Sequence, residues 1–101
     1  MTRELKAILA ATPGRLLQEE FLEPHHLSQS ELARRTGIPR STINELIKGK
    51  RPITAATAFI LGTFFGMDPQ FWINLQSRYD LRVVLFEQSE KIRARVRPLL
   101  A

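Results

Sequence analysis

The 101-residue sequence contains no cysteine, which excludes disulfide bridges and thiolate chemistry and favours a reducing cytoplasm as its compartment. It also has no apolar run that approaches the roughly 20 residues of a transmembrane helix. Its first 14 residues are too short and too interrupted for a secretory signal. We therefore expect one globular domain over residues 1–101 that has no membrane partner.

The sequence also has few residues that could support catalysis. Its only histidines, His25 and His26, are adjacent, and neighbouring histidines cannot easily bind one metal ion together. A glycine-rich phosphate loop is missing, and no histidine–acid pair is positioned to activate a serine or threonine nucleophile. The sequence therefore predicts neither an enzyme nor a metal or cofactor site, and no small-molecule substrate.

The positive charge is concentrated in one part of the chain. The net charge is +5, and residues 28–54 carry six basic residues against two acidic ones. All other residues together carry nine basic and eight acidic groups, so they are almost neutral. A local basic surface of this kind is what binding to a phosphate backbone requires.

Residues 29–48, QSELARRTGIPRSTINELIK, have the pattern of two short helices joined by a tight turn. Gly37 allows the backbone conformation of the corner, and Ala33 lets the two helices cross closely. The larger apolar residues are spaced so that they hold the second helix against a core, namely Leu32, Ile38, Ile43 and Leu46. The segment therefore predicts a helix-turn-helix, a motif whose second helix enters the major groove of DNA.

Helix signals dominate the whole chain and predict an all-α fold of five helices. Thr12 and Pro13 have the pattern of a helix start, Ser28 and Glu31 that of a capping box, and Thr54 that of a further cap. After an N-terminal extension over residues 1–12, the expected helices cover residues 14–22, 29–36, 40–48, 55–65 and 69–97. The helix at 55–65 is apolar nearly all round, so we expect it in the core.

The last of these helices carries an apolar stripe with spacings of 3, 4, 4 and 3 residues, formed by Trp72, Leu75, Tyr79, Val83 and Phe86. One helix of such a small domain rarely buries two faces against its own core. We therefore expect this helix to form a homodimer through Tyr79, Val83 and Phe86. Two alternatives remain, a chain that folds back on itself and a β-strand over LRVVLF at residues 81–86.

The helix-turn-helix pattern also predicts which side chains contact DNA. Arg40 can fork onto guanine, Asn44 can pair with adenine, and Glu45 can accept a hydrogen bond from cytosine. The full set expected to reach base edges is Pro39, Arg40, Ser41, Asn44 and Glu45. The set expected to bind phosphates is Gln29, Ser30, Lys48, Lys50 and Arg51. Because one such helix covers half a site, a dimer with half-sites about one helical turn apart is expected.

Three segments of the chain resemble the HigA family of antitoxins, which are helix-turn-helix proteins of bacterial toxin–antitoxin modules. The segments are PGRLLQEEFLEP at 13–24, LSQSELARRTGIPRSTINELIKGKRPIT at 27–54 and GMDPQFWINLQSRYDL at 66–81. The middle segment alone indicates only the broad lambda-repressor-like class, and its two neighbours are more specific. Thr57 departs from the family, in which an acidic residue often follows the threonine cap.

The resemblance implies a cytoplasmic, nucleoid-associated homodimer that binds double-stranded operator DNA in its own promoter. It also implies direct binding of a HigB toxin, an mRNA-cutting ribonuclease similar to the RelE group. A surface for such a basic toxin could be acidic, at Glu19, Glu20 and Glu23, or apolar, at Leu5, Ile8 and Leu9, although a solvated helix face is the alternative for each. Two other readings stay open, a stand-alone repressor without a toxin and a protein-interaction scaffold.

Overall fold

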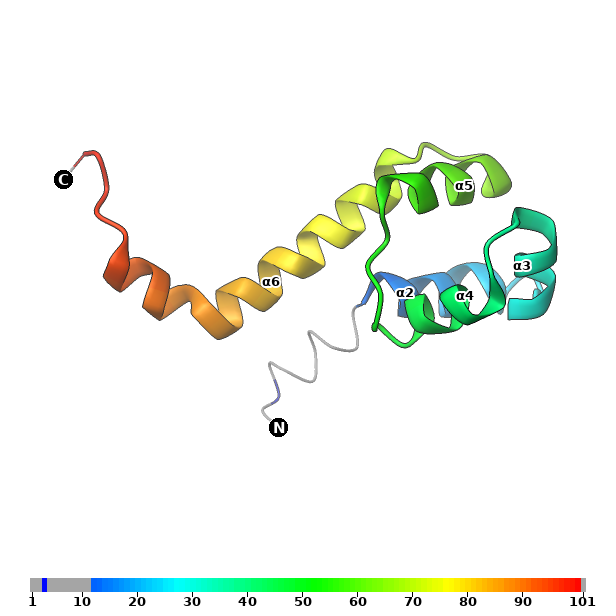
Figure 1. The fold of residues 1–101 in the computed structure, drawn as a ribbon, viewed down its shortest axis with the longest axis horizontal. Coiled ribbons are helices and arrows are strands. Elements are labelled where there is room, and N and C mark those ends of the chain that lie inside the picture. Colours follow the sequence, from blue (N-terminus) through cyan, green and yellow to red (C-terminus); the bar gives the residue numbers. More distant parts are fainter. Residues whose placement is uncertain (1–2, 4–11, 101) are drawn as a thin grey trace.

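The computed structural model describes residue 3 and residues 12–100, and this part of the chain contains helices and connecting loops only. The first helix consists of α2 (Pro13–Leu16) and a continuous π-helical stretch, η1 (Leu17–Leu22). It is followed by α3 (Gln29–Thr36), α4 (Arg40–Ile47), α5 (Ala55–Phe65) and α6 (Gln70–Arg95). The predicted all-α fold of five helices is confirmed (Figure 1).

The first helix begins where the sequence predicts it, because the Thr12 hydroxyl accepts a hydrogen bond from the Arg15 amide at 3.2 Å. The widened turn of η1 is a feature that the sequence pattern does not predict. It places residues five apart nearer to one face of the helix, and Leu17 and Leu22 are both fully buried.

Local signals also define the two helices of the helix-turn-helix. The Ser28 hydroxyl accepts from the Glu31 amide at 3.0 Å, and Gly37 ends α3 with a left-handed φ of 81°. The predicted capping box forms in one direction only, since the Glu31 carboxylate turns to Arg34 instead of to the Ser28 amide. The Ser28 hydroxyl alone therefore caps the start of α3, by accepting from one of the free backbone amides of the first turn.

Replacing Ser28 with alanine is expected to lower the free energy of unfolding by about 1 kcal/mol, because the Glu31 amide loses its acceptor. Chemical denaturation of the variant and of the parent protein measures this difference. Ser30→Ala is the matched control, since Ser30 is exposed one residue inside the same helix. Equal losses in the two variants would contradict the capping role.

Buried apolar side chains hold α4 against the core, as the spacing predicts. Leu32, Ile43 and Leu46 are buried to within 1% of complete, and Ile38 in the turn is only 6% exposed. These residues join one core that also contains Ile53 of the connector and Trp72 of α6. The orientation of α4 is therefore fixed by the same core that holds the remaining helices.

Helix α5 contributes to the core, as expected, but it does so with one side only. Ala58, Leu61 and Gly62 face the interior, whereas the Phe59 side chain is 65% exposed. An apolar composition cannot distinguish these faces because it has no periodicity from which the buried side could be read.

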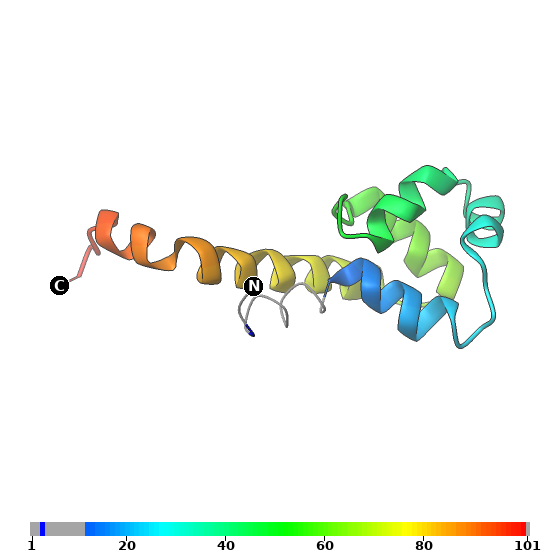
Figure 2. The ribbon, with the colours of Figure 1, turned by 90° about the horizontal axis from the view of Figure 1, so that it is seen from below.

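Helix α6 begins in the core and ends far from it. Trp72 is fully buried and packs with Phe21, Phe65 and Phe71, whose ring centroids lie 4.8 to 6.2 Å from its own. Beyond this aromatic cluster the helix projects from the other helices, and its orange part bends away from the direction of the yellow part (Figure 1). The long axis of the molecule is 53 Å, and Figure 2 shows the same projection from below. Residues 81–86 are helical, so the strand alternative is wrong. None of the described helices is both long and apolar enough to span a bilayer.

Candidate DNA-binding surface

The first half of α4 presents polar side chains on the side opposite its buried anchors. Arg40 and Ser41 are exposed and Asn44 is half-buried, and these three residues line one shallow hollow of the surface. Pro39 is exposed immediately before the helix, at the position where the chain turns into α4. The structure therefore brings four of the five predicted base-reading residues together at one end of this helix.

Asn44 and Gln29 link the two helices of the motif through their side chains. The Asn44 Nδ2 group donates to the Gln29 Oε1 atom at 3.3 Å, although the residues are 15 positions apart. This bond leaves the Asn44 carbonyl oxygen and its second N–H available, and these are the two groups that paired recognition of adenine uses. The bond therefore fixes the position of Asn44, which is predicted to contact a base, relative to Gln29, which is predicted to contact a phosphate.

Glu45 and Arg51 form an ion pair, which the sequence analysis did not predict. The Arg51 Nε atom donates to Glu45 Oε2 at 3.1 Å, and the terminal nitrogen lies 3.0 Å from the same oxygen. Both side chains are about half exposed, so the pair contributes little to stability. Its consequence is that two residues expected to bind DNA separately, one to cytosine and one to phosphate, neutralise each other in the free protein.

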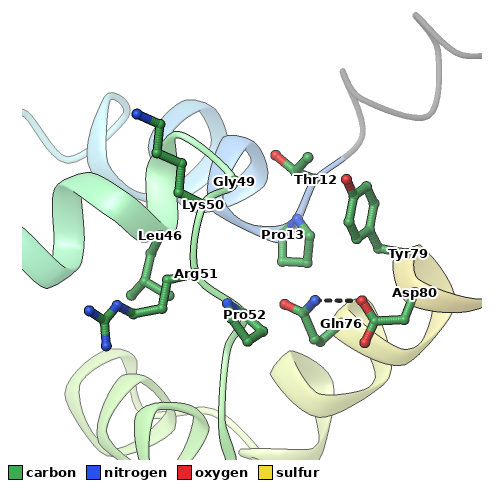
Figure 3. A pocket seen from close by; sticks show the side chains of 11 residues that line it. Thr12, Pro13, Leu46, Gly49, Lys50, Arg51, Pro52, Gln76, Tyr79 and Asp80 are labelled. Carbon is green, nitrogen blue, oxygen red and sulfur yellow. Dashed lines mark hydrogen bonds between the residues drawn. The ribbon is translucent and has the colours of Figure 1, made fainter. Parts of the chain in front are cut away.

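The remaining residues predicted to bind phosphate lie around α3, α4 and the connector after α4. Gln29 and Ser30 form the first turn of α3, where backbone N–H groups point outward and the helix dipole favours an anion. Lys48 and Lys50 are exposed at and just beyond the end of α4. Figure 3 shows Lys50 and Arg51 projecting from the connector in different directions, so they do not form a single clamp.

An ion pair between Glu31 and Arg34 lies on the outer face of α3. The hydrogen bond from Arg34 lowers the pKa of the Glu31 carboxyl, and the charges of Arg34 and Arg35 act in the same direction. Because a lowered pKa stabilises the folded state only while the carboxyl is ionised, the contribution is present at neutral pH and is lost as the pH falls. The Arg34 side chain is 70% exposed and the Glu31 side chain is 38% exposed, so the pair is not part of a buried site.

The three residues predicted to form the dimer lie in different environments. Tyr79 is half-buried and lines a cavity of about 350 Å³ between the start of α2, the connector and α6 (Figure 3). Val83 is also half-buried, whereas Phe86 is 41% exposed, beside the exposed Leu81 and Leu85. The exposed apolar surface is therefore on the projecting half of α6, and Tyr79 belongs in part to a junction within the chain.

Comparison with known proteins shows which family shares this fold and this surface. A helix-turn-helix family model matches residues 19–72, more than half of the chain. Virulence-associated protein I of Dichelobacter nodosus is 45% identical over 74 residues, 73% of this chain and 68% of that protein. The chain spans slightly less than two thirds of the length of several other curated relatives.

Two solved structures share both sequence and fold with the chain. A HigA-family addiction module antidote protein of Coxiella burnetii is 40% identical with a TM-score of 0.80, over 85% of this chain and 94% of that one. The Pseudomonas aeruginosa antitoxin HigA, solved with higBA promoter DNA, is 36% identical with a TM-score of 0.84, over 88% and 97% of the chains. The chain belongs to the HigA family of antitoxins.

Membership of the HigA family confirms the resemblance inferred from the three sequence segments. The family consists of helix-turn-helix regulators and antitoxins, so the prediction that the chain is not an enzyme is confirmed as well. In the described part of this HigA-family chain, no group of three or more His, Cys, Asp or Glu residues is arranged to hold a metal ion.

Gln76 is the polar residue of this HigA-family chain that sequence reasoning missed. Its side chain accepts a hydrogen bond from the Ile53 amide at 2.9 Å, and the Ile53 side chain is only 5% exposed. A glutamine on an amphipathic helix gives no signal of such a bond, because its partner is a backbone group 23 residues away.

Proposed function

We propose that this HigA-family chain is the antitoxin of a toxin–antitoxin module and binds operator DNA in its own promoter as a homodimer. The observation that carries the proposal is its likeness to an antitoxin solved with promoter DNA, at 36% identity and a TM-score of 0.84 over 88% of the chain. The exposed polar end of α4 on a rigid apolar support agrees with this role. Binding to the operator places the protein in the bacterial cytoplasm, at the nucleoid.

In this proposal α4 lies in the major groove and reads the bases through Arg40, Ser41 and Asn44. Arg40 forks onto the O6 and N7 atoms of guanine, and Asn44 pairs with adenine while Gln29 supports it. Pro39 lies at the rim of the groove. Glu45 reads cytosine only where DNA binding separates it from Arg51.

Phosphates on either side of the groove are bound by residues around α4. The first turn of α3, with Gln29 and Ser30, binds one phosphate through its outward N–H groups. Lys48 and Lys50 neutralise others, and Arg51 does so when it leaves Glu45. These contacts fix the position of α4 and carry no base specificity.

Replacing Lys50 with alanine is expected to weaken binding to all DNA sequences about equally. Each phosphate contact releases counterions, so the slope of log affinity against log salt should fall by about one unit. Mobility-shift titrations at several salt concentrations, on promoter DNA and on unrelated DNA, measure this slope. A loss confined to promoter DNA would contradict the phosphate-binding role of Lys50.

We propose that α6 forms the dimer, because its projecting half carries apolar side chains that the described chain leaves in solvent. Leu81, Leu85 and Phe86 are between 41% and 59% exposed, and Val83 lies half-buried on the same stretch. Pairing of two such helices would bury these side chains and set two copies of α4 at a fixed separation.

The second half of the proposed function is direct neutralisation of a HigB-like, mRNA-cleaving toxin of the RelE type. Its support is the family to which the chain belongs. Of the surfaces considered in the sequence, Glu20 and Glu23 are exposed on the first helix and its following turn, while Glu19 pairs with Arg15 at 2.7 Å. Leu5, Ile8 and Leu9 lie outside the described residues.

Two experiments test the two halves separately. A mobility-shift assay with DNA from upstream of the chain's own gene should give a sequence-specific complex, and competition by unrelated DNA at equal concentration would contradict operator binding. Co-expression with the neighbouring reading frame should give a co-purifying complex and rescue growth. If the protein binds its operator but no toxin co-purifies with it, the result would support the alternative function, a stand-alone repressor.

A further inference from the structure

We infer that Gln76 is a positioning residue that fixes the recognition helix relative to the dimerisation helix and thereby sets the half-site spacing. This inference rests on the proposed function. Gln76 lies on α6, and its Oε1 atom accepts from the amide of Ile53, which lies near the end of the connector between α4 and α5. The bond therefore joins the projecting helix to the segment that carries Lys50 and Arg51.

The orientation of the Gln76 amide is determined from both sides. A backbone N–H can only donate and an ionised carboxylate can only accept. Ile53 donates to Oε1 at 2.9 Å, and Nε2 donates to the Asp80 Oδ1 atom at 2.9 Å, one helical turn further along α6 (Figure 3). Asp80 therefore holds the amide so that its oxygen faces the connector.

The surroundings of Gln76 explain why its one hydrogen bond to Ile53 can fix the angle between α6 and the connector. The cavity of about 350 Å³ between the start of α2, the connector and α6 is lined by Thr12, Pro13, Pro52, Gln76, Tyr79 and Asp80 among others. This junction is incompletely filled by side chains, so packing alone constrains α6 less than in the core around Trp72. A directional hydrogen bond to a buried backbone group supplies the missing constraint.

The consequence concerns DNA because α6 is the proposed dimer helix. Any rotation of α6 about the junction would move the second copy of α4 along the DNA or around it. A dimer whose two recognition helices are held rigidly binds operators with one half-site spacing. A dimer whose recognition helices can move relative to each other binds operators with several spacings. Gln76 thus acts on spacing and leaves the contacts of each single α4 unchanged.

The test compares Gln76→Glu with the parent protein on three duplexes made from its own promoter. They carry both half-sites at natural spacing, both half-sites with two base pairs inserted between them, and one half-site alone. The introduced carboxylate cannot donate to Asp80 and is repelled by it, so it is no longer held in position for the Ile53 amide. The preference for natural spacing should fall roughly tenfold, while affinity for the single half-site stays within about twofold.

Gln76→Glu combined with Asp80→Asn should restore the preference, because the introduced amide can donate to the introduced carboxylate, which again accepts from Ile53. Gln70→Glu is the matched control on the same helix, where the Gln70 side chain bonds only Asn74 of its own helix. It should leave the spacing preference unchanged. If Gln76→Glu does not fold, Asp80→Ala, which removes only the group that orients the amide, should lower the preference in the same direction.

An unchanged preference in folded Gln76→Glu, or in Asp80→Ala where it replaces that variant, would overturn the inference. Equal losses on the single half-site and on the full operator would also overturn it, because Gln76 would then support α4 itself. These results are distinct from failure of the proposed function, in which the parent protein itself would not bind its promoter.

Discussion

Replacing Gly14 with alanine is expected to lower the free energy of unfolding by about 3 kcal/mol or more and to abolish operator binding. A Cβ atom at this position would lie 1.7 Å from the Leu46 carbonyl oxygen and 2.8 Å from the Ile47 Cα atom. Both are backbone atoms of α4, so no side-chain rotation can relieve the overlap. Either the first helix, which continues from α2 into η1, or the recognition helix must move, and both contribute side chains to one core.

Chemical denaturation measures this loss, and Gly37→Ala is the matched control. A Cβ atom on Gly37 would meet nothing within 4 Å, and its cost arises only from the left-handed φ of 81°. That strain amounts to roughly 1–2 kcal/mol. If Gly14→Ala costs no more than Gly37→Ala, the close approach of α2 to α4 does not constrain the recognition helix.

The difference between these glycines shows what could be predicted from the sequence. Gly37 could be assigned because its role is local, at the end of a helix and the corner of a motif. The same holds for the caps at Thr12, Ser28 and Thr54, whose acceptors and donors lie three residues apart. Hydrogen bonds between near neighbours leave a pattern in the sequence, and the predicted helices follow it closely.

Features that depend on distant neighbours could not be predicted. The approach of Gly14 to Leu46, the ion pair of Glu45 with Arg51 and the bond of Gln76 to Ile53 all join different structural elements. Nothing about a glycine in a first turn, or a glutamine on an amphipathic helix, indicates which backbone atoms will lie beside it. The exposed face of α4 could be predicted, because a helix-turn-helix fixes from its own pattern which face of the second helix is exposed.

Alanine substitutions at Arg40 and Asn44 are the second prediction with a large expected effect. Each should remove a paired contact with one base, which costs about 1–3 kcal/mol per contact. A homodimer presents each residue twice, so the loss on a symmetric operator should be about 2–6 kcal/mol for each substitution. Helix content should stay unchanged, since Arg40 is exposed and Asn44 is only half-buried.

Competition assays distinguish a base contact from a phosphate contact. Loss of a base contact weakens promoter binding and leaves affinity for unrelated DNA almost unchanged, whereas loss of a phosphate contact weakens both. Arg78→Ala is the matched control for Arg40→Ala, because it removes the same charge from an exposed position on α6. Equal weakening of Arg40→Ala on all sequences would assign Arg40 to the phosphate backbone.

The Asn44 substitution carries a further expectation because of its bond to Gln29. Gln29→Ala removes the same bond and leaves the Asn44 side chain in place but unsupported. If the link orients Asn44 for adenine, Gln29→Ala should lose part of the specificity that Asn44→Ala loses, and the double variant should be no worse than Asn44→Ala at that base. Additive losses in the double variant would mean that Gln29 acts only through its phosphate, since independent contacts at separate sites add.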